Sequence, residues 1–207
     1  MLENGGREEL RLLFASGEGP GAISAAAAVL RERVRDPDLV AAARTELVRS
    51  IASGARRGRL HAIAVAPIAA DDAAGPILDA LQQASKDDDA EIRVSALGRL
   101  AARDVPPEKR ADVTARLEAI AGQKDDPELA SRARELLAGA GDVRVQAWLE
   151  EDLRAGDPSV RLSAVGALAQ LRRASRAAPI LADPDASART RGACALLLAA
   201  RLGPPLR

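Results

Sequence analysis

The residue types that most often carry out chemistry in proteins are sparse in this sequence of 207 residues. His61 is its single histidine and Cys194 its single cysteine. A multi-histidine metal site needs more than one histidine, and a nucleophilic triad would need His61 to meet partners from distant segments. One cysteine excludes an internal disulfide and a zinc site made of cysteines. We predict that His61 is structural, that Cys194 is a buried packing residue, and that the protein is not an enzyme and carries no cofactor or metal.

The acidic run Asp87, Asp88, Asp89 and Glu91 is the pattern closest to a metal-binding loop. A calcium-binding loop needs a glycine near its sixth position, followed by a glutamate ligand. This sequence has Ile92 at that position, where an apolar helical pattern begins. Acidic residues in the first turn of a helix interact favourably with the helix dipole. We therefore predict that this run caps a helix and binds no metal.

The overall charge excludes several classes of protein. The chain has 30 basic and 30 acidic residues, so it lacks the basic excess typical of nucleic-acid binders. Its apolar stretches are far shorter than the roughly 20 residues that span a bilayer. The N-terminal sequence shows no basic start followed by an apolar run, as a signal peptide would. We expect a cytoplasmic protein without a membrane span.

The elements that position these residues are predicted to be helices. Alanine, the strongest helix former, makes up 47 of the 207 residues, whereas the chain has one Phe, one Trp and no Tyr. Strands favour β-branched and aromatic residues, so this composition predicts an all-α fold. Asp-Pro pairs mark three helix starts, because Asp accepts hydrogen bonds from free amides and Pro fits the first helical position. These pairs are Asp36-Pro37, Asp126-Pro127 and Asp157-Pro158.

An internal repeat runs through these helices. It consists of a turn aspartate, an aliphatic residue three positions later, arginine at four, a small residue at seven and leucine at eleven. Two weaker copies start at Asp36 and Asp126 and lack the arginine. The long gap between Asp36 and Asp89 predicts an additional degenerate helix around Arg57–Ala69. The full copies are Asp89, Ile92, Arg93, Ala96 and Leu100; Asp157, Val160, Arg161, Ala164 and Leu168; and Asp185, Ala188, Arg189, Gly192 and Leu196.

The positions of the repeat have a physical role that does not depend on a family. The small residue lets neighbouring helices approach closely, and the aliphatic residue and the leucine face the next layer. One helix pair cannot bury both of its faces, so such pairs stack into layers. We expect Arg93 and Arg161 to reach the turn aspartate of their own layer or of an adjacent one.

This pattern resembles the HEAT-repeat family, especially the short bacterial HEAT-like repeats. The resemblance is carried by "GDPSVRLSAVGALAQL" (Gly156–Leu171) and by "AAGPILDALQQASKDDDAEIRVSALGRLA" (Ala73–Ala101). It implies a right-handed α-solenoid of about five to six helix pairs in a single domain over residues 1–207. The repeats are clearest over residues 75–198, and residues 1–52 are expected to form degenerate or capping helices.

Solenoids expose extended surfaces that suit the binding of other proteins. We therefore expect a non-catalytic scaffold or adaptor. One alternative is a nucleic-acid-binding HEAT-like protein or a DNA glycosylase-like enzyme, although such proteins use basic grooves and stacking aromatics that are scarce here. A second alternative, suggested by the repeat resemblance alone, is a bilin lyase-like protein. No His or Cys constellation supports it.

The distribution of charge gives the candidate partner-binding residues. Residues 61–130 carry a net charge of −6 and residues 131–207 a net charge of +4. Arginine binds carboxylates through two parallel hydrogen bonds, so an arginine cluster suits a partner with an acidic surface. The acidic segment of a second copy is another possible ligand, which would give self-association. The candidate residues are Arg172, Arg173, Arg176, Arg189 and Arg191.

Overall fold

In the computed structural model, described over residues 4–16, 19–32, 34–68, 75–102, 105 and 107–202, the chain is helical and contains no strand. This confirms the predicted all-α class. The helices divide into two compact units, each described here by itself. Met1–Leu100 with Asp104–Lys109 form the N-terminal unit, and Ala101–Arg103 with Arg110–Arg207 form the C-terminal unit. A single domain over residues 1–207 stays a prediction.

The N-terminal unit holds α1 (Asn4–Ser16), α2 (Gly19–Arg31), α3 (Pro37–Ser53), α4 (Arg56–Val65), α5 (Gly75–Ala84) and most of α6 (Ala90–Ala101). The C-terminal unit holds most of α7 (Pro107–Ala121), then α8 (Pro127–Ala140), the 3-10 turn η2 (Val143–Val145), α9 (Gln146–Asp152), α10 (Pro158–Gln170), the 3-10 segment η3 (Ala174–Ala182) and α11 (Ala186–Leu202). Within the described residues, no helix is long and apolar enough to cross a membrane.

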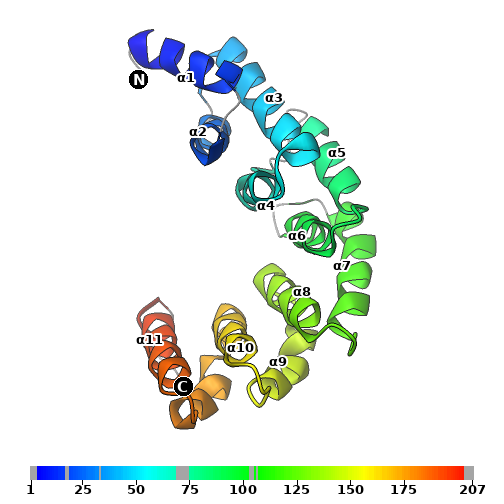
Figure 1. Cartoon of the computed structure of the whole chain (residues 1–207), viewed down its shortest axis with the longest axis vertical. Helices are drawn as coiled ribbons and strands as arrows, with labels where there is room; N and C mark the ends of the chain where they lie inside the picture. The colour runs from blue at the N-terminus through cyan, green and yellow to red at the C-terminus, as the bar shows by residue number, and fades with distance from the viewer. Residues whose placement is uncertain are drawn as a thin grey trace. The chain divides into compact units, whose positions relative to one another are not determined.

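Each unit is built of helices that contact mainly their neighbours in sequence. In the N-terminal unit, α1, α3 and α5 follow one another along one side, and α2, α4 and α6 along the other (Figure 1). In the C-terminal unit, α10 packs between α8 and α11, while α9 and η3 connect them (Figure 1). The degenerate helix predicted around Arg57–Ala69 is α4.

One repeat assignment was wrong. The sequence placed the helix after Asp36 in the same register as the helix after Asp89. The structure puts the first of these, α3, in the row of α1 and α5, and the second, α6, in the opposite row (Figure 1). Both helices start with an aspartate cap because capping satisfies free amides at any helix start, whichever side of the layer the helix occupies.

The Asp-Pro pairs start helices as predicted. Asp36, Asp126 and Asp157 are the N-caps of α3, α8 and α10, and each is followed by proline in the first turn. The carboxylate of Asp126 accepts a hydrogen bond of 3.0 Å from the backbone N–H of Leu129. The connecting segment η3 stays a 3-10 helix around Pro179, whose missing N–H cannot continue an α-helical ladder.

The small positions of the repeat lie where helices approach one another. Ala164 of α10 has no exposed surface, and Ala96 of α6 is equally buried. A Cβ atom added to Gly192 of α11 would collide with the side chain of Ile180 in η3. The repeat positions therefore describe the packing of successive helices, which brings the turns before α10 and α11 close together.

Candidate partner-binding surface

An arginine-aspartate pair ties α10 to the turn before α11. Arg161 is the fourth residue of α10, and Asp183 lies three residues before the first residue of α11. Arg161 donates from Nε to Oδ2 of Asp183 at 2.5 Å and from Nη2 to Oδ1 at 2.8 Å. Its Nη1 also donates to the backbone oxygens of Ala155 and Gly156, in the turn before α10. One guanidinium thus joins two successive turns, as the sequence predicted for Arg161.

The same relation recurs in the N-terminal unit. Arg59 is the fourth residue of α4, and Asp87 lies three residues before the first residue of α6. Arg59 donates from Nη2 to Oδ2 of Asp87 at 2.5 Å, and from Nε to the backbone oxygen of Ile51. The hydrogen bond from Arg59 is the main reason that the pKa of Asp87 lies below its usual value.

The contact between α8 and α10 has neither partner. The fourth residue of α8 is Ala130, and the residue three before the start of α10 is Ala155. At this contact, alanine thus replaces both the arginine and the aspartate, and the helices are held together by apolar packing. Arg93, which was also expected to reach a turn aspartate, donates to the backbone oxygens of Asp87 and Asp88 in its own turn.

The five predicted partner-binding arginines lie at two separate places. Arg172 and Arg173 are exposed directly after α10, and Arg172 adopts a left-handed conformation with φ of 58°. Arg176 of η3 places Nε 3.8 Å from Oε1 of Glu150. Arg189 and Arg191 are exposed in the first two turns of α11.

The two groups are separated by the length of α10. Arg189 donates from Nη1 to the backbone oxygen of Asp183, and Asp183 pairs with Arg161 in the first turn of α10. Arg172 instead lies two residues after the end of this helix, which has 13 residues and is about 20 Å long. The structure therefore does not join the five arginines into one cluster, and their role in partner binding stays a prediction.

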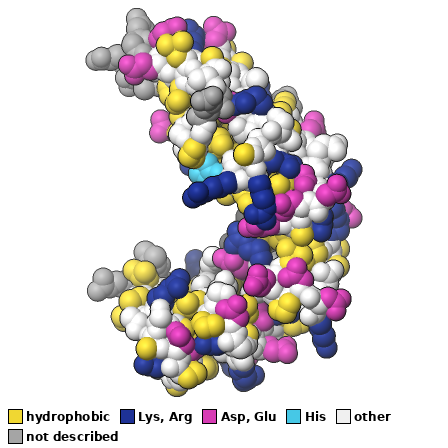
Figure 2. All heavy atoms as spheres, viewed as in Figure 1, with side chains coloured by type: hydrophobic (Ala, Val, Ile, Leu, Met, Phe, Trp, Pro, Cys, Tyr) yellow, Lys and Arg dark blue, Asp and Glu magenta, His cyan; other side chains and the backbone are white. Residues whose placement is uncertain are grey.

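Exposed apolar side chains gather on the last two elements of the C-terminal unit. Leu197 and Leu198 of α11 are 66% and 58% exposed, and Leu181 of η3 is 51% exposed. Figure 2 shows hydrophobic side chains at the surface of this unit. Cys194 is exposed as well, so its prediction as a buried packing residue was wrong. The residues around Cys194 in α11 are apolar at almost every position, so their periodicity did not indicate which face of the helix is buried.

The side of α11 that points away from α10 is only partly covered. Positions 28 residues apart correspond in α10 and α11, because both helices have the same repeat. Val165 and Leu168 of α10 are fully buried. Their counterparts Ala193 and Leu196 in α11 are partly exposed, and Arg189, the counterpart of the buried Arg161, is exposed.

The single histidine makes a contact that the sequence did not indicate. His61 of α4 places Nε2 2.9 Å from Oγ of Ser24 in α2. Ser24 lies in the middle of its helix, where backbone amides are already used in the helical ladder and cannot stabilise an oxyanion. The bond joins two neighbouring helices, which supports the predicted structural role of His61. Figure 2 shows basic side chains next to this histidine.

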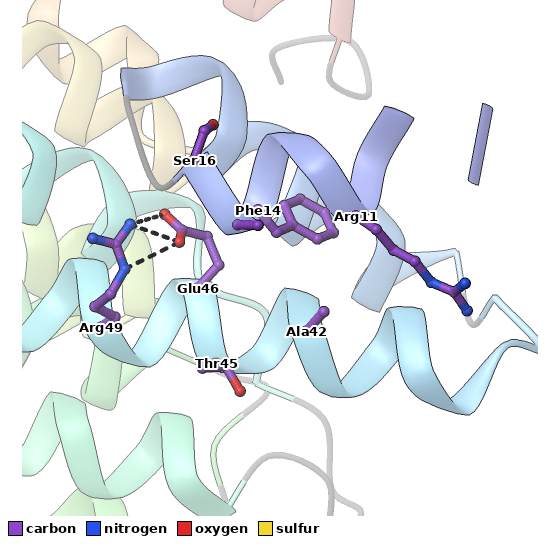
Figure 3. Close-up of a pocket in the computed structure, with 8 residues that line it drawn as sticks. Arg11, Phe14, Ser16, Ala42, Thr45, Glu46 and Arg49 are labelled. Atoms are coloured by element: carbon purple, nitrogen blue, oxygen red, sulfur yellow. Dashed lines mark hydrogen bonds and ion pairs between the residues drawn. The ribbon is translucent and has the colours of Figure 1, made fainter. Parts of the chain in front are cut away.

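A groove of about 410 Å³ lies between α1 and α3 (Figure 3). Phe14, the single phenylalanine, is buried and lines this groove. The carboxylate of Glu46 is almost completely buried, and Arg49 donates to both of its oxygens. Ser50 adds a further hydrogen bond of 2.9 Å to Oε1. Because Glu46 is paired within the protein, its charge does not need a ligand.

A second buried carboxylate lies beside the single tryptophan. Arg134 of α8 stands over the ring of Trp148, with Cζ 5.6 Å from the ring centroid, and also donates to Oδ1 of Asp152. Oδ2 of Asp152 is buried and has no partner among the described residues. Burial raises the pKa of Asp152 above its usual value. Trp148 of α9 therefore packs against Arg134 of α8.

No protein-family model matches the chain, and no curated protein is recognisably similar to it. Within the described residues, no three His, Cys, Asp or Glu side chains come together in a way that could hold a metal ion. The acidic run at Asp87–Glu91 instead caps α6, where Oδ1 of Asp89 accepts from the backbone N–H of Glu91 and Ile92.

Proposed function

We propose that this protein is a non-catalytic scaffold or adaptor that binds another protein. We further propose that its helices form a right-handed solenoid of about five to six HEAT-like pairs. Support for the solenoid comes from the two rows of helices in the N-terminal unit and from the arginine-aspartate pairs that join successive layers. A stack of this kind offers long helical surfaces to a partner.

The observation that carries the proposal is the exposure of two adjacent leucines on α11, Leu197 and Leu198. Single exposed leucines are common on soluble proteins, but clustered ones mark interaction sites. In α10, the positions that correspond to Leu197 and Leu198 hold Ala169 and Gln170, whose exposure costs little. At these two positions, α11 therefore has large apolar side chains, whereas α10 has a small and a polar side chain.

The exposed arginines add the expected charge of the partner. Arg172 and Arg173 precede Leu181 in the chain, and Arg189 and Arg191 precede Leu197 on the same helix. Arginine forks favour carboxylates, so a protein with an acidic surface beside an apolar patch fits the site.

The test replaces the two adjacent leucines by serine, giving L197S/L198S. The tagged wild-type chain and the variant are expressed in the source cell, and the proteins they retain are quantified by mass spectrometry. Leu12 of α1 is 63% exposed, so L12S is a control with the same chemical change on another surface. We expect a protein that is retained by wild type and L12S and lost with L197S/L198S. Identical retention by all three chains would contradict the proposal.

A further inference from the structure

We propose that the partly exposed side of α11, formed by Arg189, Ala193 and Leu196, binds a helix of the partner protein whose preceding turn supplies an aspartate to Arg189. This inference rests on the proposed function and specifies the docking element of the partner. It predicts that the arginine–aspartate contact found between successive helices of this chain also forms between α11 and the partner.

The first support is the repeated internal contact. The contact occurs in two places. Each time, an arginine at the fourth position of a helix binds an aspartate in the turn that leads to the next helix of the same row, three residues before that helix starts. These pairs are Arg59–Asp87 and Arg161–Asp183. Both aspartates also accept a hydrogen bond of 2.9 Å from the backbone N–H two residues later, so each carboxylate is held in position.

The second support is the conformation of Arg189, the fourth residue of α11. Its Nη1 donates to the backbone oxygen six residues earlier, as Nη1 of Arg161 and Nη1 of Arg93 also do. In Arg161, this bond leaves Nε and Nη2 directed at Asp183. In Arg189, Nε and Nη2 have no partner among the described residues, so both are available to a carboxylate from another molecule.

The third support is the partial exposure of the surrounding apolar surface. On α10, Val165 and Leu168 are buried completely beside the arginine-aspartate pair. On α11, the corresponding Ala193 and Leu196 are only partly covered. A helix placed on α11 as α11 is placed on α10 would bury both residues together with the Arg189 charge pair.

The charge of the occupant favours a different protein over a second copy of this chain. The first helix of the row in a second copy would be α2, and the residue three before its start is Ser16, which has no carboxylate. Asp36, which follows the C-terminal end of α2, already accepts from the backbone N–H of Leu39 and pairs with Arg7 and Arg11. In a second copy, Ser16 could therefore not take the place that Asp183 has in the internal contact.

The experiment uses a peptide with the chemistry of the expected docking element. It spans residues 173–200, which place Asp183 before the α11 helix. Arg189 of the peptide is replaced by glutamine so that the peptide does not stack on itself. A hydrocarbon staple joins positions 190 and 194, which are exposed in α11, to keep the peptide helical. Binding of the fluorescent peptide to the full chain is measured by anisotropy.

The proposal expects saturable binding that the R189Q variant of the full chain weakens by about tenfold or more, because a carboxylate would lose its buried partner. R191Q removes the same charge two residues away and is expected to have little effect. The D183N peptide should bind the wild-type chain as weakly as the original peptide binds the R189Q chain. The D183N peptide and the R189Q chain together should lose no more affinity than either change alone, because both remove the same contact. Hydrogen exchange should show protection of α11 on binding.

Three results would overturn the inference. The first is no binding of the stapled peptide at 200 µM. The second is an equal loss with R189Q and R191Q, which would indicate unspecific charge attraction. The third is self-association of the wild-type chain that R189Q abolishes, which would make a second copy the occupant. If R189Q still retains the cellular protein that L197S/L198S loses, this inference fails while the proposed scaffold function stands.

Discussion

The carboxylate of Asp183 shows how single residues hold the layers together. It accepts two hydrogen bonds from Arg161 and one from the backbone N–H of Asp185, and its side chain is only 3% exposed. The bonds from Arg161 are the main cause of its lowered pKa. Burial without enough donors has the opposite effect at Asp152, where desolvation raises the pKa.

These two aspartates predict opposite dependences of stability on pH. A carboxyl group with a lowered pKa in the folded state contributes stability above its unfolded pKa of about 3.9, and this contribution is lost as the pH falls through the folded value. The difference in free energy of unfolding between wild type and D183N should therefore shrink below about pH 4. For a raised pKa the sign is reversed, so wild type should lose stability relative to D152N as the pH rises above about 4.

Urea unfolding of wild type, D183N and D152N between pH 2.5 and 7 measures both differences. The exposed Asp88 gives the control variant D88N, which corrects for the general change in charge. A difference between wild type and D183N that stays constant over this range would contradict the coupling of Asp183 to Arg161.

At the scale of the helices, the small positions of the repeat determine packing. Ala164 lies at the contact of α10 with its neighbours and is completely buried. The substitution A164L adds three carbon atoms to this contact and should lower the free energy of unfolding by roughly 1–3 kcal/mol. Denaturant unfolding at pH 7 measures it. An unchanged midpoint would mean that α10 can rotate or shift to accommodate leucine.

Two glycines give a matched pair for the same principle. A Cβ at Gly166 of α10 would meet no atom within 4 Å, whereas a Cβ at Gly192 of α11 would collide with Ile180. Alanine is the better helix former by about 0.8–1.0 kcal/mol, so G166A should stabilise the protein by up to that amount. G192A should destabilise it, because Ile180 lies in the way. Thermal unfolding of the two variants tests the contrast, and stabilisation by both would contradict close packing at Gly192.

Much of the helical organisation was predictable from local sequence signals. The Asp-Pro starts of α3, α8 and α10 and the helix around Arg57–Ala69 follow from capping and spacing, which act within a few residues. The small residue at Gly192 was predictable because the repeat requires close approach there. Local signals do not distinguish the two rows of helices, and this is why α3 was assigned to the wrong one.

The candidate surface was less predictable. In "RGACALLLAA", apolar residues occupy almost every position, so no periodicity separates the buried Gly192 from the exposed Cys194, Leu197 and Leu198. The bond between Ser24 and His61 joins residues 37 positions apart, and no spacing rule connects them. The sequence predicted that Arg161 binds an aspartate of its own or an adjacent turn. Only the packing of η3 shows that this aspartate is Asp183.

At the scale of the whole molecule, the chain is neutral but its charge is uneven. Residues 61–130 carry a net charge of −6, and residues 131–207 a net charge of +4. If the partner has an acidic surface, the exposed Arg172 and Arg173 contribute to its attraction over the distance set by salt screening.

The corresponding prediction concerns the double variant R172S/R173S. It should bind the partner more weakly than wild type at 0.05 M salt, and the two should become similar near 1 M, where the Debye length is about 3 Å. R154S, which removes an exposed arginine before α10, is the control. Titration of the purified partner at both salt concentrations measures the effect. Equal salt dependence in wild type and R172S/R173S would assign these arginines to an ordinary solvated surface.

The shared absence of arginine and aspartate between α8 and α10 has a consequence for how the protein opens. Acid protonates Asp87 and Asp183, and so removes the negative charge from the contact of α4 with α6 and from the contact of α10 with α11. The contact of α8 with α10 has alanines at the corresponding positions 130 and 155, which do not titrate. Opening in such stacked structures proceeds by local units whose boundaries are their weakest contacts. Acid below about pH 4 should therefore weaken the attachment of α11 to α10 before it weakens the contact between α8 and α10, so that the pH determines which contact opens first.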